Sequence, residues 1–135
     1  MNCIIVDDDL ASRLLIQKLI ERSGELSLVK SCVSSFEAID VLKSEAIDLM
    51  FLDIQMPEMT GLELLDSLSE TPQIILITGK ADFAVDAFKY DVTDYLVKPI
   101  SFPRFMKSIN KVFRYIEKNK KNNSITKSKR PFVFL

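Results

Sequence analysis

Short apolar runs alternate along the chain with segments whose apolar residues recur every three or four positions. Strands are predicted over residues 3–6, 28–33, 48–53, 73–78 and 94–97. Helices are predicted over residues 10–24, 34–46, 61–68 and 81–90, and from about Ser101 onward. Because the strands lack polar alternation, both of their faces should be buried. The pattern therefore predicts an α/β fold with a doubly wound, five-stranded parallel sheet flanked by five helices.

Several residues mark where the predicted helices begin and end. Ser34 and Glu37 have the spacing of a capping box, and Gly24 is a suitable helix stop. Pro103 is tolerated in the first turn of the last helix. Apolar side chains recur at helical spacing along this helix, at Phe102, Phe105, Met106, Ile109, Val112, Phe113 and Ile116. This helix should pack one face on the sheet.

Polar residues stand where the apolar strands end. They are Asp7, Asp8, Asp9, Asp53, Thr78 and Lys98. In doubly wound sheets the functional crevice lies outside the carboxyl ends of the strands, so these residues should meet there. Clustered carboxylates repel one another, and a hard divalent cation such as Mg²⁺ would relieve that repulsion. Beside it a carboxylate can attack phosphorus, with Lys98 and Thr78 offering a charge and a hydroxyl to the transferred group.

Each of these residues also has a purely structural explanation. A single aspartate at a strand end can cap a helix or form a turn, and three in a row can complement a helix dipole. Thr78 suits a strand because it is β-branched, and Lys-Pro sequences occur in loops. The functional interpretation rests on the coincidence of all of them at one edge of the sheet.

Four motifs give a more specific indication. "IIVDDD", "FLDIQMPEMTGLELL", "IILIT" and "DYLVKPI" occur in this order. In types and spacing the chain resembles the receiver domains of two-component response regulators over residues 2 to about 118. The resemblance implies a flavodoxin-like sheet with strand order 2-1-3-4-5. It also implies a signalling domain, not an enzyme acting on an external substrate, that catalyses only its own Mg²⁺-dependent phosphorylation and dephosphorylation.

The resemblance assigns roles to the residues of the acidic edge. Asp53 would accept a phosphoryl group from a sensor histidine kinase. Asp8 would bind Mg²⁺ directly together with Asp53 and the backbone carbonyl of Gln55, while Asp7 would act through water. Lys98 would pair with the phosphoryl group. Pro57 would shape the loop after Asp53, and Gly61 would free the chain to enter the next helix.

It also implies a switch. Thr78 would swing toward the phosphoryl group and Tyr95 would move with it. The Lys98–Pro99 peptide bond would be cis. The output surface, and a face for dimerisation, would be formed by the helix over residues 81–90, the strand over 94–97 and the last helix.

Three other functions compete with this one. An FMN-binding protein of the same fold needs a glycine- and hydroxyl-rich phosphate loop, whereas "DDDLAS" would repel a phosphate. A phosphatase of the haloacid-dehalogenase type needs "DxDxT", and "DIQMP" lacks the second aspartate. A pseudo-receiver would have lost some of the site. One departure from the receiver pattern is Gly79, where the family usually has alanine or another small residue. Gln55 is one of several residue types found at a position that tunes the lifetime of the phosphoryl group. The sequence therefore does not predict this lifetime.

Composition narrows the setting. The 135 residues suggest one domain, and the absence of histidine excludes a Ser-His-Asp triad and a histidine-based zinc site. Cys3 and Cys32 lie in apolar runs and are expected to be reduced core residues. No run has the ~20 apolar residues of a membrane span, and the first residues lack the pattern of a signal peptide. We expect a cytoplasmic protein.

The C-terminal end differs from the rest. Residues 114–130 carry seven Lys or Arg and one acidic residue, whereas the remainder has a net charge of −7. We expect a receiver domain over 1–118 and, over 119–135, a basic linker and the start of a missing DNA-binding domain. "PFVFL" resembles a first strand, and the region 79–105 resembles the LytTR-type regulators more than the OmpR type. If the missing domain exists, transcription would be controlled through it, and DNA would be bound only by it. The alternative is that residues 119–135 are a solvated end without function.

Overall fold

The computed structural model describes residues 1–79 and 90–126, and over residues 121–126 it describes the helix without its side chains. Its five strands are β1 (Asn2–Val6), β2 (Ser27–Cys32), β3 (Leu49–Asp53), β4 (Gln73–Thr78) and β5 (Asp94–Val97). They form one parallel sheet in the order β2-β1-β3-β4-β5. The predicted sheet and its strand order are confirmed.

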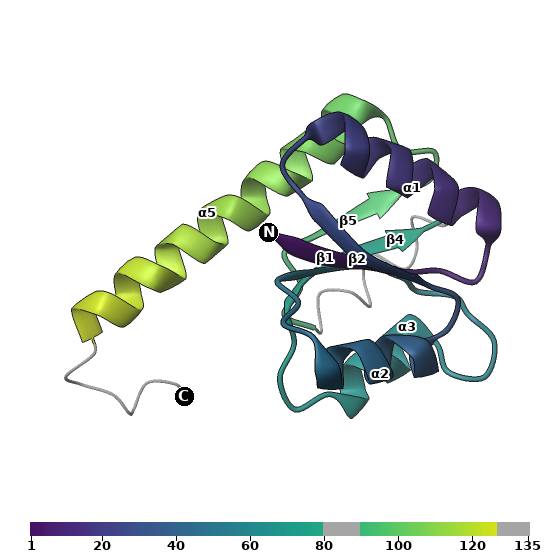
Figure 1. The fold of residues 1–135 in the computed structure, drawn as a ribbon, viewed down its shortest axis with the longest axis horizontal. Coiled ribbons are helices and arrows are strands. Elements are labelled where there is room, and N and C mark those ends of the chain that lie inside the picture. Colours follow the sequence, from purple (N-terminus) through teal and green to yellow (C-terminus); the bar gives the residue numbers. More distant parts are fainter. Residues whose placement is uncertain (80–89, 127–135) are drawn as a thin grey trace.

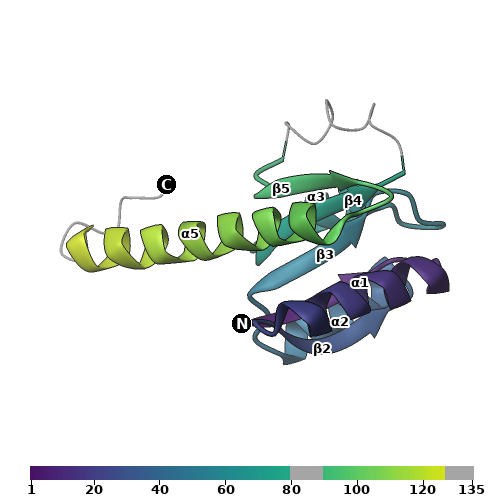
Figure 2. The same ribbon diagram turned by 90° about the horizontal axis from the view of Figure 1, so that it is seen from above.

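Within the described ranges the sheet is flanked by four helices. They are α1 (Leu10–Ser23), α2 (Ser35–Ser44), α3 (Gly61–Ser67) and α5 (Phe102–Thr126). In Figure 1, α1 and α5 cover one face of the sheet and α2 and α3 cover the other, and Figure 2 shows the same layers from above. The helix expected over residues 81–90 lies, apart from its last residue, outside the described residues.

Two apolar clusters hold the layers together, one on each face of the sheet. The first joins alternate strand residues such as Ile5 and Phe51 to α1 and to Phe105 of α5, whose ring stacks on Phe51 with centroids 5.4 Å apart. The second joins the intervening strand residues to α2 and α3. The central strands β1, β3 and β4 are thus buried on both faces, which is why they lack polar alternation, whereas the edge strand β2 is mostly exposed or half-buried.

The ends of the helices follow the expected signals with one change. Gly24 ends α1 in the left-handed conformation, at φ 70°. Ser34 accepts from the amide of Glu37, but the Glu37 carboxylate accepts from the Val33 amide, so the expected reciprocal box is shifted by one residue. A full capping box forms instead at α3, between Thr60 and Glu63.

Both cysteines are fully buried and reduced, at 0% exposure. Burial raises the pKa of the Cys3 thiol to about 12 and that of Cys32 to about 11, so neither is a nucleophile near neutral pH. They pack in the apolar clusters, as expected.

Helix α5 is longer than the sequence indicates. It continues to Thr126, so residues 119–126, expected as the start of a linker, are helical. The helix extends beyond the sheet, as Figure 1 shows. Over residues 1–79 and 90–126, no helix combines the length and the apolar composition needed to cross a membrane.

Candidate functional site

Three aspartates meet at the carboxyl edge of the sheet. Asp7 and Asp8 follow β1, and Asp53 is the last residue of the neighbouring strand β3. Their carboxylate oxygens lie within 4.8 Å of one another. Asp7 and Asp53 are buried, at 1% and 6% exposure, whereas Asp8 is exposed. The parallel register that brings the ends of adjacent strands together therefore also assembles the acidic cluster.

The loop after Asp53 is held close to the strand end. The Ile54 amide continues the ladder to the Ile77 carbonyl, and the Gly61 amide donates to the Ile54 carbonyl at 2.9 Å. A Cβ at position 61 would lie 2.2 Å from the Asp53 carbonyl oxygen. Glycine is thus required because the backbone passes so close, and not only because it gives freedom to enter α3 as expected from the sequence. Glu58, at φ 66°, occupies the left-handed region in this loop.

Lys98 reaches the cluster from the opposite side. It follows β5, and its amide donates to the Thr78 carbonyl at 2.8 Å. Its Nζ lies 3.2 Å from Oδ2 of Asp7, and its side chain is 28% exposed. The next peptide bond, Lys98–Pro99, is cis, which is the geometry that the resemblance implies. In this structure Lys98 therefore neutralises one of the three carboxylates.

One cation does not balance three carboxylates, and the imbalance falls on Asp53. Burial, and secondarily the charge of Asp7, raises the pKa of Asp53 to about 7. The Lys98 charge and the Gln55 amide, 3.4 Å from Oδ1, act in the opposite direction. A second cation at this edge would favour the ionised form of Asp53, and a site of oxygen donors suits a hard ion such as Mg²⁺.

The remaining expected residues surround this edge. Thr78 ends β4 and is 1% exposed. Tyr95, in β5, pairs in register with Leu76 and packs partly buried against the second apolar cluster. Gln55 is exposed. The structure thus brings Asp7, Asp8, Asp53 and Lys98 together and places Thr78 and Tyr95 on the two adjacent strands.

Two neighbours of the cluster have roles that the sequence did not assign. Asp9 lies outside the cluster: it caps α1 by accepting from the Ser12 amide at 3.0 Å, and its own amide donates to Oδ1 of Asp7 at 2.9 Å. The structural explanation of the aspartate run thus holds for Asp9, and Asp7 has a structural contact in this turn in addition to its place in the cluster. Arg13 donates to the Asp7 carbonyl at 2.7 Å and holds the turn after β1. The only feature of the sequence that could have indicated this contact is the position of Arg13, one helical turn after Asp9.

A third buried carboxylate, Asp94, lies at the start of β5, away from the acidic cluster, and the sequence did not point to it. Arg104 of α5 binds it with both terminal nitrogens, at 2.9 and 3.1 Å, and donates to the Tyr95 carbonyl at 3.1 Å. Ser108 donates to the same carboxylate, and the Lys111 Nζ lies 3.4 Å from it. Burial would raise the pKa of Asp94, but the bonds from Arg104 and Ser108 outweigh it and lower the pKa to about 2. We call Asp94, Arg104, Ser108 and Lys111 the Asp94 network.

The fold and the acidic edge together define a phosphoacceptor-type signalling domain. The family model described as "Response regulator receiver domain" matches residues 3–110. The chain belongs to this family, the receiver domains of two-component systems.

Curated relatives agree with this. An uncharacterized response regulatory protein of Shewanella oneidensis is 35% identical over 83% of this chain and 48% of its own length. The transcriptional regulatory protein BtsR of Salmonella typhi is 32% identical over 83% of this chain and 48% of its own. The sensory transduction protein LytR of Staphylococcus haemolyticus is 31% identical over 93% and 50%. The chain therefore spans about half the length of the curated relatives it matches.

Solved structures are similar as well. The response regulatory domain of mrkE from Klebsiella pneumoniae has a TM-score of 0.78 and 27% identity, covering 87% of this chain and 99% of that one. The response regulator TrrA of Thermotoga maritima, solved in complex with Mg²⁺ and BeF, has a TM-score of 0.73 and 25% identity, covering 82% and 97%.

Proposed function

We propose that Asp53 accepts a phosphoryl group from a phosphohistidine of a sensor kinase, in a Mg²⁺-dependent reaction. The observation that carries the proposal is the cluster of Asp7, Asp8 and Asp53 with Lys98 beside it. A carboxylate oxygen of Asp53 attacks phosphorus, and the P–N bond breaks with its electron pair remaining on the imidazole. The acceptor must be ionised to attack, so its raised pKa has to be countered when the reaction occurs.

The donor set fits Mg²⁺. When bound, the ion would supply charge neutralisation to the carboxylates and to the phosphoryl oxygens. Asp8 is exposed, whereas both oxygens of Asp7 already have partners, Oδ1 in the Asp9 amide and Oδ2 in Lys98. This supports Asp8 and Asp53 as direct ligands and Asp7 as a residue that acts through water. The backbone carbonyl of Gln55 completes the proposed set.

Lys98 and Thr78 hold the transferred group in this proposal. Lys98 exchanges its contact with Asp7 for one with the phosphoryl oxygens, because those carry more negative charge after transfer. The Thr78 hydroxyl donates to another of these oxygens. Tyr95 then moves with Thr78, since β4 and β5 are adjacent and paired at Leu76 and Tyr95. The readout surface would include β5 and α5, where dimerisation also remains a prediction.

The surface beside the site suits a protein donor. Leu10, Leu14 and Leu15 of α1 are exposed at 59%, 48% and 42%. A pocket of about 330 Å³ next to them is lined by apolar residues of α1 and by Lys98, Pro99 and Ile100. A partner that packs on these leucines would be positioned to present its phosphohistidine to Asp53, which supports a kinase helix as the donor surface.

The wider role is also a proposal. The transcriptional regulatory protein BtsR and the sensory transduction protein LytR are about twice as long as the matched region, which supports a receiver over residues 1–118 within a larger regulator. We place it in the cytoplasm, with residues 119–135 forming a basic linker and the start of a LytTR-type DNA-binding domain.

Phosphorylation with a small donor tests the central claim without the kinase. With acetyl phosphate and Mg²⁺, the chain should gain one base-labile phosphoryl group, measured by intact mass. Asp53→Asn should lose it completely, whereas Asp40→Asn, at an exposed position of α2, should leave it unchanged. Equal labelling of the Asp53 variant would refute the assignment.

A further inference from the structure

One face of α5 (Phe102–Thr126) is basic between Lys107 and Lys118. Lys107, Lys111, Arg114 and Lys118 recur at steps of four, three and four, so they project from the same side of the helix. The apolar residues that pack on the sheet occupy the opposite side. We call these four residues, with Tyr115, the basic face of α5.

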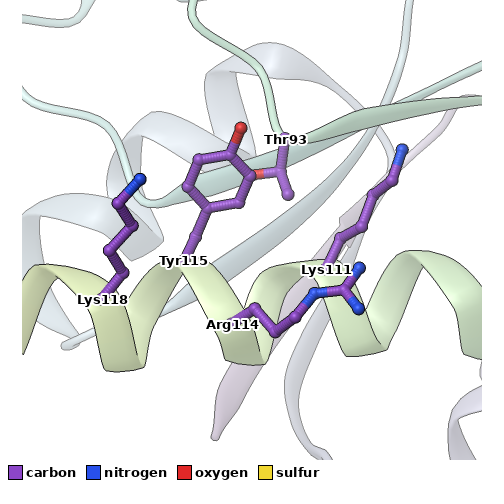
Figure 3. Close-up of a pocket in the computed structure, with 5 residues that line it drawn as sticks. All are labelled: Thr93, Lys111, Arg114, Tyr115 and Lys118. Carbon is purple, nitrogen blue, oxygen red and sulfur yellow. The ribbon is translucent and has the colours of Figure 1, made fainter.

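The basic face contains a concave site. Lys111, Arg114, Tyr115 and Lys118 line a pocket of about 320 Å³ together with Thr93, which precedes β5. In Figure 3 the two lysines flank the Tyr115 ring, and the Arg114 side chain runs beneath Lys111. Tyr115 is 48% exposed and offers an aromatic face and a hydroxyl. The pocket therefore presents hydrogen-bond donors and positive charge around one aromatic ring.

Little negative charge balances this face. Like charges three and four residues apart on a helix repel each other. Asp94 accepts from Arg104 and lies 3.4 Å from Lys111. Arg114 and Lys118 form no ion pair with any residue in the described ranges. An adjoining pocket, which shares Tyr115 and Thr93 with this site, is lined by one exposed carboxylate, Asp91. The face thus keeps a net positive charge at Arg114 and Lys118 that an external anion would neutralise.

The shape of the face favours a linear polyanion. From Lys107 to Lys118 the helix rises about 16 Å, at 1.5 Å per residue. The helix continues past the sheet, and the chain stays basic through residue 130. A row of cations along a straight helix matches the row of phosphates along a nucleic-acid strand better than it matches a single small anion.

We propose that the basic face of α5 binds phosphates of a nucleic-acid backbone, without reading bases. Arg114, Lys118 and Lys111 contact phosphate oxygens, and Tyr115 packs against the sugar and donates from its hydroxyl. In the proposed larger regulator this contact would add affinity beside the DNA-binding domain, which departs from the expectation that DNA is bound only by that domain. The inference rests on the proposed link to transcription, but not on phosphoryl transfer at Asp53.

Fluorescence anisotropy with a labelled DNA duplex at low salt tests this. The chain should bind weakly, with log K falling against log salt at a slope of about −3 for three phosphate contacts. Arg114→Glu/Lys118→Glu should weaken binding by more than tenfold. Its matched control is Lys18→Glu/Lys43→Glu, which changes the net charge equally at exposed lysines of α1 and α2. The control should bind within about twofold of the unchanged chain.

Several results would overturn the proposal. They are no binding by the unchanged chain, equal losses in the two charge-reversed variants, tighter binding to poly-glutamate than to DNA at equal charge, and competition by inorganic phosphate at the concentration of duplex phosphate. Acetyl phosphate labelling separates this failure from that of the proposed function. Arg114→Glu/Lys118→Glu should still be labelled at Asp53, and Asp53→Asn should still bind DNA.

Discussion

Asp53 and Asp94 are both buried carboxylates of the same sheet, yet their surroundings shift their pKa values in opposite directions. Asp53 shares its edge with Asp7 and Asp8 and one lysine, and burial beside Asp7 raises its pKa to about 7. Asp94 receives two bonds from Arg104 and one from Ser108, with Lys111 nearby, and its pKa falls to about 2. Burial raises the pKa of both carboxyl groups, so the charges and hydrogen-bond donors around each one decide the direction of its net pKa shift.

The difference separates chemistry from structure. A carboxylate whose oxygens both accept hydrogen bonds is a poor nucleophile and a poor metal ligand, but here it ties β5 to α5. A carboxylate in an acidic cluster destabilises the fold, but the same unbalanced negative charge allows it to bind a cation or to react. The two ends of this sheet thus use the same residue type for opposite purposes. Substitutions of Asp94 and of Asp53 test this difference separately.

The largest stability effect is expected at Asp94. Asp94→Ala should lower the free energy of unfolding by about 3–5 kcal/mol, because it removes the charge-assisted hydrogen bonds that Arg104 and Ser108 donate to this buried carboxylate. Urea denaturation at pH 7 measures this. Phosphorylation of Asp53 by acetyl phosphate should persist in the molecules that remain folded.

The control for Asp94 is Asp40→Ala, at an exposed position of α2, which should change stability by less than about 0.5 kcal/mol. A loss at Asp94 no larger than at Asp40 would mean that the Asp94 network does not hold α5 on β5. Abolished phosphorylation in a folded Asp94 variant would mean that the two regions are not separate.

The sequence predicted which residues gather at the acidic edge, because in a parallel sheet each of them only has to end its own strand. Each of Asp7, Asp53, Thr78 and Lys98 ends its own apolar run, and the sheet order then brings the ends to one edge. Lys98 meets Asp7 although 91 residues separate them. No pairwise distance had to be known.

The Asp94 network could not be predicted in this way. It joins the start of β5 to residues 104, 108 and 111. This contact depends on where α5 is positioned along β5, which the sequence does not specify. The available signal was the spacing of four and three among polar residues beside an apolar stripe. Gly61 was likewise explained by flexibility, because the approach to the Asp53 carbonyl depends on three-dimensional loop geometry.

The sequence did not predict where α5 ends, for a different reason. Residues 119–126 are polar and basic, which is typical of linkers, but they extend a helix already anchored through Ile109 and Val112. Adding residues to an existing helix is far easier than starting one. Composition alone does not contain that information.

The next effect is expected at Asp53, with the opposite sign. A carboxyl group whose pKa is raised from 3.8 to about 7 destabilises the fold fully above pH 7, and this penalty fades as the pH falls toward 4. Asp53→Asn should therefore raise the free energy of unfolding by about 2–4 kcal/mol at pH 8, and by much less at pH 4.5. Urea titrations at the two pH values give the comparison.

Mg²⁺ supplies the control for Asp53. Added at pH 8, it should stabilise the unchanged chain more than Asp53→Asn, because the ion relieves the same repulsion that the substitution removes. A stability gain independent of pH, or equal stabilisation of both chains by Mg²⁺, would contradict the electrostatic origin of the effect.

The smallest effect is expected on the acid side, again at Asp94. Its pKa is lowered from 3.8 to about 2, so its stabilising contribution is complete above pH 4 and is lost as the pH falls through 2. The contribution is about 2 kcal/mol, since one pKa unit corresponds to ~1.4 kcal/mol. The unchanged chain should therefore lose about 2 kcal/mol more between pH 4 and pH 2 than Asp94→Asn, which has no charge to neutralise at this position. Thermal unfolding followed by circular dichroism at half-unit pH steps measures the two slopes, with Asp40→Asn as the exposed control that should follow the unchanged chain. Parallel acid limbs in all three proteins would show that Arg104 and Ser108 do not stabilise the ionised form of Asp94, and the contrast with Asp53 would then reduce to burial alone.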